Sequence, residues 1–211
     1  GAAEPAKTPV GYSEAARWYR TYLQSVPKDA AAASTNLLLA ETLFESGDLV
    51  SAATEFERTA YDYPKNDKSA AAAYSALVAY QRHEATLDGA DKAAWNQRSI
   101  DAGVKFASAF PEHPDSGGVL TRSAEQVFAL GNLPRAIELA EQVLARQPPV
   151  DVAKQRIAWT IVGQANFDQK KFAEAEQGFM AARNVAGGDD KLRVDLNERL
   201  AQSVYRQAEA K

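Results

Sequence analysis

The chain has 211 residues, no cysteine and a formal net charge of −4. Without cysteine it has no disulfide, no thiol chemistry and no cysteine-ligated zinc. A slightly acidic chain also argues against nucleic-acid binding, which needs clustered Lys and Arg. Because the sequence has no run of about 18 apolar residues, it predicts no membrane span.

Residues 1–10 are polar and contain Pro5 and Pro9. We predict that this N-terminal segment is disordered. Its composition resembles the stretch that follows a removed signal sequence or lipid anchor. The sequence is therefore compatible with a membrane anchor that lies outside these 211 residues.

From residue 11 onward, apolar residues recur at three- and four-residue spacing between turns marked by proline or glycine. Alanine is abundant and β-branched runs are scarce, which favours helix over strand. No segment alternates like a strand, so the predicted fold class is all-α. The expected helices span residues 12–25, 30–46, 49–62, 68–86, 91–109, 116–130, 133–146, 151–169, 172–184 and 190–209.

The second helix of each hairpin carries a recurring pattern: Ala, an aromatic residue four positions later in four of the five copies, a further residue after three more, and then proline, which Gly187 replaces in the last copy. A small residue lets two helix backbones approach, an aromatic ring fills the space beside it, and proline ends the helix. The pattern occurs at Ala15/Tyr19/Tyr22/Pro27, Ala52/Phe56/Thr59/Pro64, Ala102/Phe106/Ala109/Pro114, Ala136/Ala140/Val143/Pro148 and Ala175/Phe179/Ala182. The first-helix signature, a large residue and then a small one, survives best as Trp159 and Gly163.

These hairpins resemble the tetratricopeptide repeat (TPR), a unit of about 34 residues. The resemblance implies a right-handed superhelix, with residues 11–211 forming one solenoid domain of about five units. The last helix, 190–209, aligns with a first helix, because Leu200, Ala201 and Tyr205 fall in register with Leu39, Ala40 and Phe44. We expect it to be unpaired or to act as a cap.

The third hairpin is longer than the others. Pro64 and Pro114 lie 50 residues apart, whereas Pro114 and Pro148 lie 34 apart. We therefore expect longer helices there, a wide turn at residues 87–91 and the least regular part of the array.

Two turns, at residues 61–67 and 110–116, are similar to junctions in TPR-like proteins of the bacterial envelope, among them outer-membrane-assembly and Tol-Pal-associated proteins. This second resemblance implies a periplasmic or outer-membrane-associated location. A cytoplasmic location is the alternative.

Nothing in the sequence suggests catalysis. His83 and His113 are 30 residues apart, and no catalytic, nucleotide-binding or HExxH motif is present. We predict no catalytic residue, no metal ligand and no cofactor. We also expect the large aromatic residues to pack between helices rather than to form a stacking platform for sugars or bases; these are Trp18, Tyr74, Tyr80, Trp95 and Trp159.

One further pattern pairs an acid or amide with an aromatic residue three positions later. In TPR proteins the first helices line a concave groove, and the resemblance places these pairs there. We call the set the polar–aromatic ladder: Glu41, Phe44, Glu125, Phe128, Gln164, Phe167, Gln202 and Tyr205, with Ala79 and Arg82 interrupting it in the third unit. The alternative is that the rings pack against the next hairpin while the polar groups are merely solvated.

The predicted function is a non-catalytic scaffold that binds a protein or peptide partner in this groove. A structural or oligomerisation module that docks through its terminal helices is one alternative. A helical domain that binds or processes glycans is another.

Overall fold

The computed structural model describes residues 9–185 and 190–209. It divides into two compact units, the first ending at Ala102 and the second beginning at Gly103. The division falls within α5 (Gly89–Ala109), which belongs to the long third hairpin. Each unit is described by itself.

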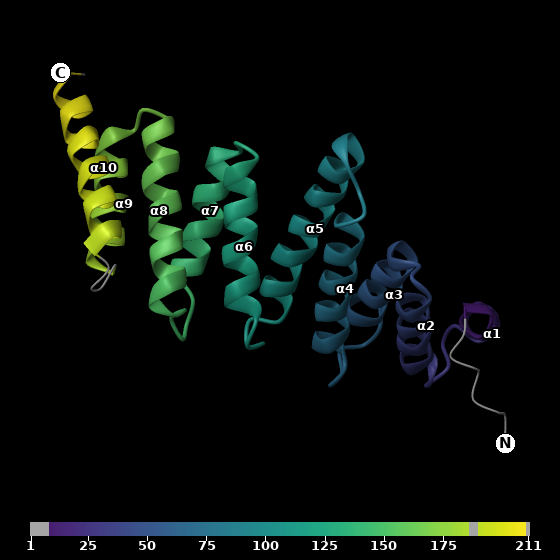
Figure 1. Ribbon diagram of the computed structural model, residues 1–211. Coiled ribbons are helices and arrows are strands. Elements are labelled where there is room, and N and C mark those ends of the chain that lie inside the picture. Colours follow the sequence, from purple (N-terminus) through teal and green to yellow (C-terminus); the bar gives the residue numbers. More distant parts are fainter. Residues whose placement is uncertain (1–8, 186–189, 210–211) are drawn as a thin grey trace. The chain divides into compact units, whose positions relative to one another are not determined.

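The first unit consists of helices that pack in chain order, α1 on α2, α2 on α3 and α3 on α4 (Figure 1). These are α1 (Pro9–Ser25), α2 (Ala32–Ser46), α3 (Leu49–Tyr61) and α4 (Ser69–Glu84), followed by the first part of α5.

The second unit continues from the last part of α5. In it α6 packs on α7, α7 on α8, α8 on α9 and α9 on α10, and the first helices α6 and α8 also contact each other. These are α6 (Ser116–Ala129), α7 (Leu133–Leu144), α8 (Val152–Asp168), α9 (Phe172–Asn184) and α10 (Asp190–Glu209).

Across the described ranges the regular secondary structure is helical throughout, in ten helices, which confirms the all-α prediction. Within each unit the helices form consecutive hairpins. Of the N-terminal segment predicted to be disordered, residues 1–8 lie outside the described residues, but Pro9 and Val10 already belong to α1. That boundary was wrong, because proline is well suited to the first turn of a helix.

Small residues and rings form the core of each hairpin. In the first unit Ala40 of α2 and Ala52 and Phe56 of α3 are buried. A buried polar contact joins the same helices, because Asn36 Nδ2 donates to Glu55 O at 2.8 Å and to Thr59 Oγ1 at 2.9 Å. The side of α3 that carries residues 55 and 59 is thus covered by its first helix, α2.

Helices α8 and α9 approach each other closely enough that glycines are required at their contact. A Cβ built on Gly178 would lie 2.6 Å from the backbone nitrogen of Gly163, and one built on Gly163 would lie 2.6 Å from a ring carbon of Phe179. Phe179 is the centre of a buried cluster, with Leu196 from α10 on its other side and Trp159 packed against it. The predicted pairing of a small first-helix residue with an aromatic second-helix residue is confirmed at this site.

The third hairpin differs from its prediction in the turn. The α5 helix already begins at Gly89, whose φ is 55°, so the expected wide turn at residues 87–91 shortens to residues 85–88. Asp91 in the first turn of α5 favours this extension, since a carboxylate stabilises a helix N-terminus. The extra length of the hairpin lies in the 21 residues of α5.

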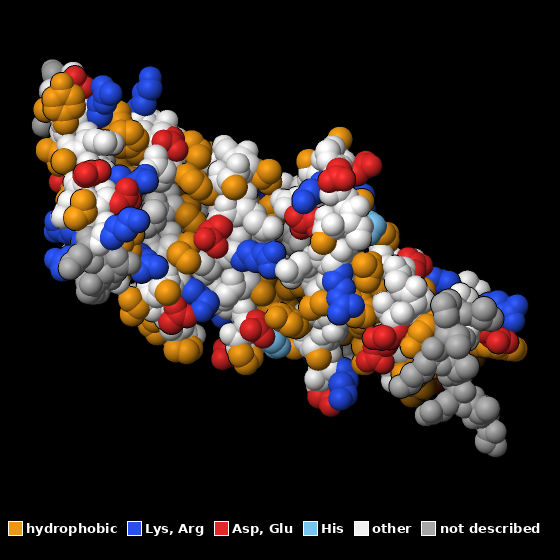
Figure 2. Space-filling model, viewed as in Figure 1, with side chains coloured by type: hydrophobic (Ala, Val, Ile, Leu, Met, Phe, Trp, Pro, Cys, Tyr) orange, Lys and Arg blue, Asp and Glu red, His pale blue; other side chains and the backbone are white. Residues whose placement is uncertain are grey.

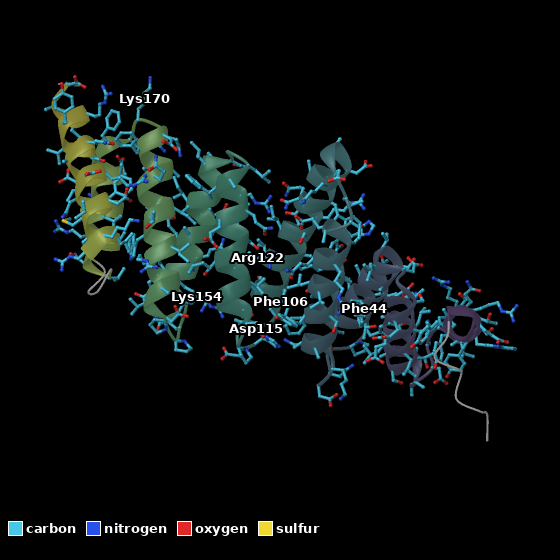
Figure 3. The ribbon with its side chains drawn as sticks, viewed as in Figure 1. Phe44, Phe106, Asp115, Arg122, Lys154 and Lys170 are labelled. Atoms are coloured by element: carbon cyan, nitrogen blue, oxygen red, sulfur yellow. The ribbon has the colours of Figure 1, made fainter. Side chains whose placement is uncertain are left out.

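Three of the described turns within hairpins, α2–α3, α6–α7 and α8–α9, share a residue in the left-handed conformation. Gly47 and Gly131 have φ of 87° and 77°, and the cap residues after them, Asp48 and Asn132, accept from Ser51 N and Arg135 N respectively. In the α8–α9 turn the corresponding left-handed position is Lys170, with φ of 62° (Figure 3). A side chain with a Cβ makes that conformation costly, so this turn is strained where the other two are not.

We expect Gly178→Ala to destabilise the second unit by about 1–3 kcal/mol, because the added methyl meets backbone rather than a movable side chain. The matched control is Gly118→Ala, whose Cβ meets only the end of Lys154 at 3.4 Å. The control is expected to gain up to about 1 kcal/mol from helix propensity. Urea unfolding measures both, and equal effects would contradict the close approach.

We expect Lys170→Gly to stabilise the chain by about 0.5–1 kcal/mol, because glycine adopts φ > 0 without a steric penalty. The reciprocal variant, Gly131→Lys, is expected to lose about 1–2 kcal/mol. Thermal and urea unfolding of the two variants measure this. A destabilised Lys170→Gly would show that the turn has no strain to relieve.

Candidate functional site

The polar–aromatic ladder divides by exposure. Its charged members, Glu41 and Glu125, are exposed, as are Gln202 and the interrupting Arg82. The rings of Phe44, Phe128 and Phe167 are half-buried, so each has one side against the protein and one toward solvent. Tyr205 differs from them, with 61% of its surface exposed.

In the first unit the ladder residues of two successive first helices meet. Arg82 of α4 places its guanidinium 4.4 Å from the ring centroid of Phe44 on α2, a cation–π geometry. The same ring packs edge-on against Phe56 of α3 at 6.1 Å. The Phe44 ring therefore packs against α3 within its own hairpin and also contacts Arg82 of the next first helix.

Ala79, which interrupts the ladder in the third unit, is completely buried. The α4 helix buries Ala72, Ala73, Ala76 and Ala79 on one continuous face, and such a stripe packs against neighbouring helices.

In the second unit three ladder residues from α8 and α10 line one pocket: Gln164, Phe167 and Gln202. The pocket has a volume of about 220 Å³ and opens to solvent. Phe179 contributes to its apolar floor, and the rest of its lining comes from α10, namely Asp195, Glu198 and Arg199. The structure thus brings together three residues that the repeat register assigns to one predicted groove.

The polar groups of the pocket are linked by hydrogen bonds. Arg199 donates through Nη1 to Gln164 Oε1 and through Nε to Asp195 Oδ2 at 2.9 Å. Gln164 Nε2 in turn donates to Asp168 Oδ1 at 2.8 Å. The carboxylate of Asp195 offsets the charge of Arg199, so Glu198 gives the pocket rim its net negative charge.

Sequence reasoning missed Arg199, although a signal was available. It lies one turn before Gln202 and four residues after Asp195, a spacing that places oppositely charged side chains together on a helix. Three other ladder members of the second unit do not line this pocket: Glu125, Phe128 and Tyr205.

A second pocket of about 440 Å³ lies on another side of α8, between the second helices α7 and α9. Its lining combines apolar Trp159 and Ile137 with polar Asn166 and Gln169. The sequence prediction placed no site here, because second helices carry no repeated exposed pattern that would mark one.

Trp95 and the two histidines pack against neighbouring groups, whereas Trp18 is exposed. Trp95 is buried, donates through Nε1 to Tyr80 O at 2.9 Å and packs edge-on with His83 at 4.4 Å. His113 packs edge-on against Phe106 at 5.0 Å. Both histidines therefore take part in packing at helix ends, and Trp95 is a core residue as expected. Trp18 is not, because 63% of it is exposed.

Burial and the neighbouring charge of Glu57 raise the pKa of Tyr80 to about 12. Its phenol therefore stays neutral at physiological pH and acts as a packing group. Within the described ranges no group of three or more His, Asp or Glu side chains is arranged to hold a metal ion. No described helix is both long and apolar enough to cross a bilayer.

Comparison with known proteins gave one kind of similarity. No protein-family model matches the chain, and no curated protein does. Among solved structures, the chain is similar to a thermophilic TPR protein of Thermus thermophilus, with 15% sequence identity and a TM-score of 0.45. The alignment covers 90% of this chain and 91% of that protein. This similarity is too distant to assign the chain to a family.

The ladder rings differ in how much they stabilise the fold. We expect Phe167→Ala to cost about 2–4 kcal/mol, because the ring packs edge-on with Phe172 at 5.4 Å and adjoins the Phe179 cluster. Tyr205→Ala is expected to change stability by no more than about 0.5 kcal/mol, since most of its surface is exposed. Chemical unfolding of both variants measures this, and comparable losses would contradict the different packing of the two rings.

Proposed function

We propose that this protein is a non-catalytic scaffold that binds a peptide segment of another protein along its first helices, with the α8–α10 pocket as the anchoring site. The observation that carries the proposal is the convergence of Gln164, Phe167 and Gln202 on one solvent-open pocket. TPR-like arrays are typical of proteins that recognise peptides and helices.

The size of the pocket favours a side chain over a free small molecule. Its volume of about 220 Å³ is below the roughly 300–1,000 Å³ of small-ligand sites. A single apolar side chain resting on Phe167 and Phe179 suits that space. Recognition of a peptide then needs groups around the pocket that bind its backbone.

The amide side chains at the pocket supply those groups. Gln202 is exposed and its carboxamide both donates and accepts hydrogen bonds, which matches a peptide backbone. Gln164 is already bonded to Arg199 and Asp168, so it is held in position. Preorganised polar groups lose less entropy when a ligand binds.

The charge at the rim indicates the sequence of the peptide. With Arg199 paired to Asp195, Glu198 remains as the exposed charge of the pocket. Glu125 on α6 is also exposed and acidic. We therefore propose a partner segment with an apolar anchor flanked by Lys or Arg.

We propose a bacterial envelope location for this activity, periplasmic or outer-membrane-associated. The support is the similarity of the turns at 61–67 and 110–116 to those of envelope TPR-like proteins, together with the absence of cysteine. Fractionation of the source organism with an antibody against this chain tests the location. Recovery in the cytosolic fraction would contradict it.

A peptide-display selection on the immobilised chain tests the binding site. Affinities of enriched peptides are then measured by calorimetry for three variants. We expect Gln202→Trp, which fills the pocket mouth, to weaken binding by about tenfold or more, equivalent to about 1.4 kcal/mol. Glu198→Lys is expected to weaken binding of Lys- or Arg-containing peptides in a salt-dependent way.

The control is Glu112→Lys, an exposed acid in the turn before α6 that does not line the pocket. It makes the same charge reversal and is expected to leave affinity unchanged. Peptides that bind all three variants with the affinity of the native chain would refute the site. Enrichment of acidic peptides would refute the proposed sequence preference.

A further inference from the structure

Both terminal helices of the described array leave one apolar face uncovered. On α1, Trp18 and Tyr22 are 63% and 37% exposed, and on α10, Val204 and Tyr205 are 48% and 61% exposed. Figure 2 shows hydrophobic side chains on the surface at the C-terminal end of α10, at the upper left. Such faces on a helical array normally contact a further helix.

The register identifies what covers the face on α1. Aligning Ala15 with Ala52 places Trp18 on Glu55 and Tyr22 on Thr59. In α3 those two positions contact the first helix, because Asn36 of α2 donates to Glu55 O and Thr59 Oγ1. The exposed side of α1 is therefore the side on which a second helix receives its first helix.

The register also identifies what covers the face on α10. Ala201 aligns with Ala40 and Gly163, the small residues at which second helices approach first helices. Gly163 is covered by Phe179 of α9 and Ala40 is completely buried, whereas Ala201 is exposed. The exposed side of α10 is therefore the side on which a first helix receives its second helix.

A hydrogen-bonding residue of α2 has a counterpart in α10. Asn197 aligns with Asn36, the residue that bonds across the α2–α3 hairpin. Arg183 Nη1 donates to Asn197 Oδ1 at 3.2 Å, which leaves Nδ2 of Asn197 to donate as Asn36 does. In a hairpin made with α1, its acceptor would be the carbonyl of Trp18, the counterpart of Glu55.

The side of α10 opposite this exposed face is packed against the rest of the second unit. Leu196 and Ser203 are fully buried, and Gln207 donates to Phe172 O at 3.2 Å and to Glu176 Oε2 at 2.6 Å. Its open face is therefore presented by a helix already anchored to α9, so little ordering is needed before it binds.

We propose that copies of this chain associate head to tail, with α10 of one copy and α1 of the next completing a single TPR-like hairpin. Trp18 then lies in the interface beside Val204 and Ala201. Because the two faces differ, the contact is heterologous and each assembly keeps one free face at either end. The first helix α6 contacts α8, so α10 is expected to contact α2 of the added copy in the same way.

Sedimentation and light scattering over a concentration series test the proposal. The mass is expected to rise above 22.8 kDa in steps of one copy as concentration increases. Trp18→Glu and Val204→Glu each place a charge in one face, and both residues are exposed in the single copy. Each variant alone is expected to lose about 30-fold or more in self-affinity, as buried aromatic and apolar anchors do at interfaces.

Mixing the two variants is the decisive measurement. Trp18→Glu keeps an intact α10 face and Val204→Glu keeps an intact α1 face, so the mixture is expected to form a 1:1 dimer that grows no further. A mass of one copy at every concentration of the native chain would overturn the proposal. Self-association of either variant alone, with the native affinity, would also overturn it and would indicate a contact between two like faces.

The control is Val152→Glu, an exposed apolar residue at the start of α8 that lies on neither face. It is expected to associate like the native chain. Circular dichroism and melting temperature confirm that each variant is folded, so a loss of association with native helicity is attributable to the face. The peptide site also includes a residue of α10, Gln202. If Val204→Glu binds a selected peptide with native affinity but does not self-associate, the two proposals are tested independently.

Discussion

The structure depends on how closely two helices can approach within a hairpin. Where α8 and α9 cross, glycines face each other, and a methyl group on Gly178 would collide with the backbone of Gly163. The ring of Phe179 occupies the space beside them and joins α9 to Leu196 of α10. Interiors are packed so densely that this one contact determines both the hairpin and the position of the next helix.

This packing scheme explains how a ladder ring can pack in a hairpin core and still have a side open to solvent. Phe167 packs against Phe172 and the Phe179 cluster, yet its other side lines the pocket between α8 and α10. Phe44 packs against Phe56 of α3, and its ring also contacts the guanidinium of Arg82. Residues one turn beyond the small crossing residue therefore serve stability and surface chemistry together, and mutating them changes both.

A repeating array also determines the character of its terminal helices. Each internal helix is covered on two sides by neighbours, whereas a terminal helix of the described array is covered on one. The α10 helix shows the consequence: Leu196 and Ser203 are buried while Val204, next in sequence, is exposed. The uncovered faces on α1 and α10 correspond in register to the two halves of one repeated unit, and the proposed association rests on that correspondence.

The sequence by itself determined the helices, their order and the small residues at their crossings. These follow from local chemistry: periodic apolar positions, helix-ending proline and glycine, and alanine or glycine wherever backbones approach. Only the tertiary structure decided that Ala79 is buried, that Arg82 stacks on Phe44, and that Arg199 rather than Tyr205 joins Gln164 and Gln202. Those outcomes depend on how each helix rotates against its neighbours, and that rotation is set by packing between residues distant in sequence, which helical periodicity does not encode.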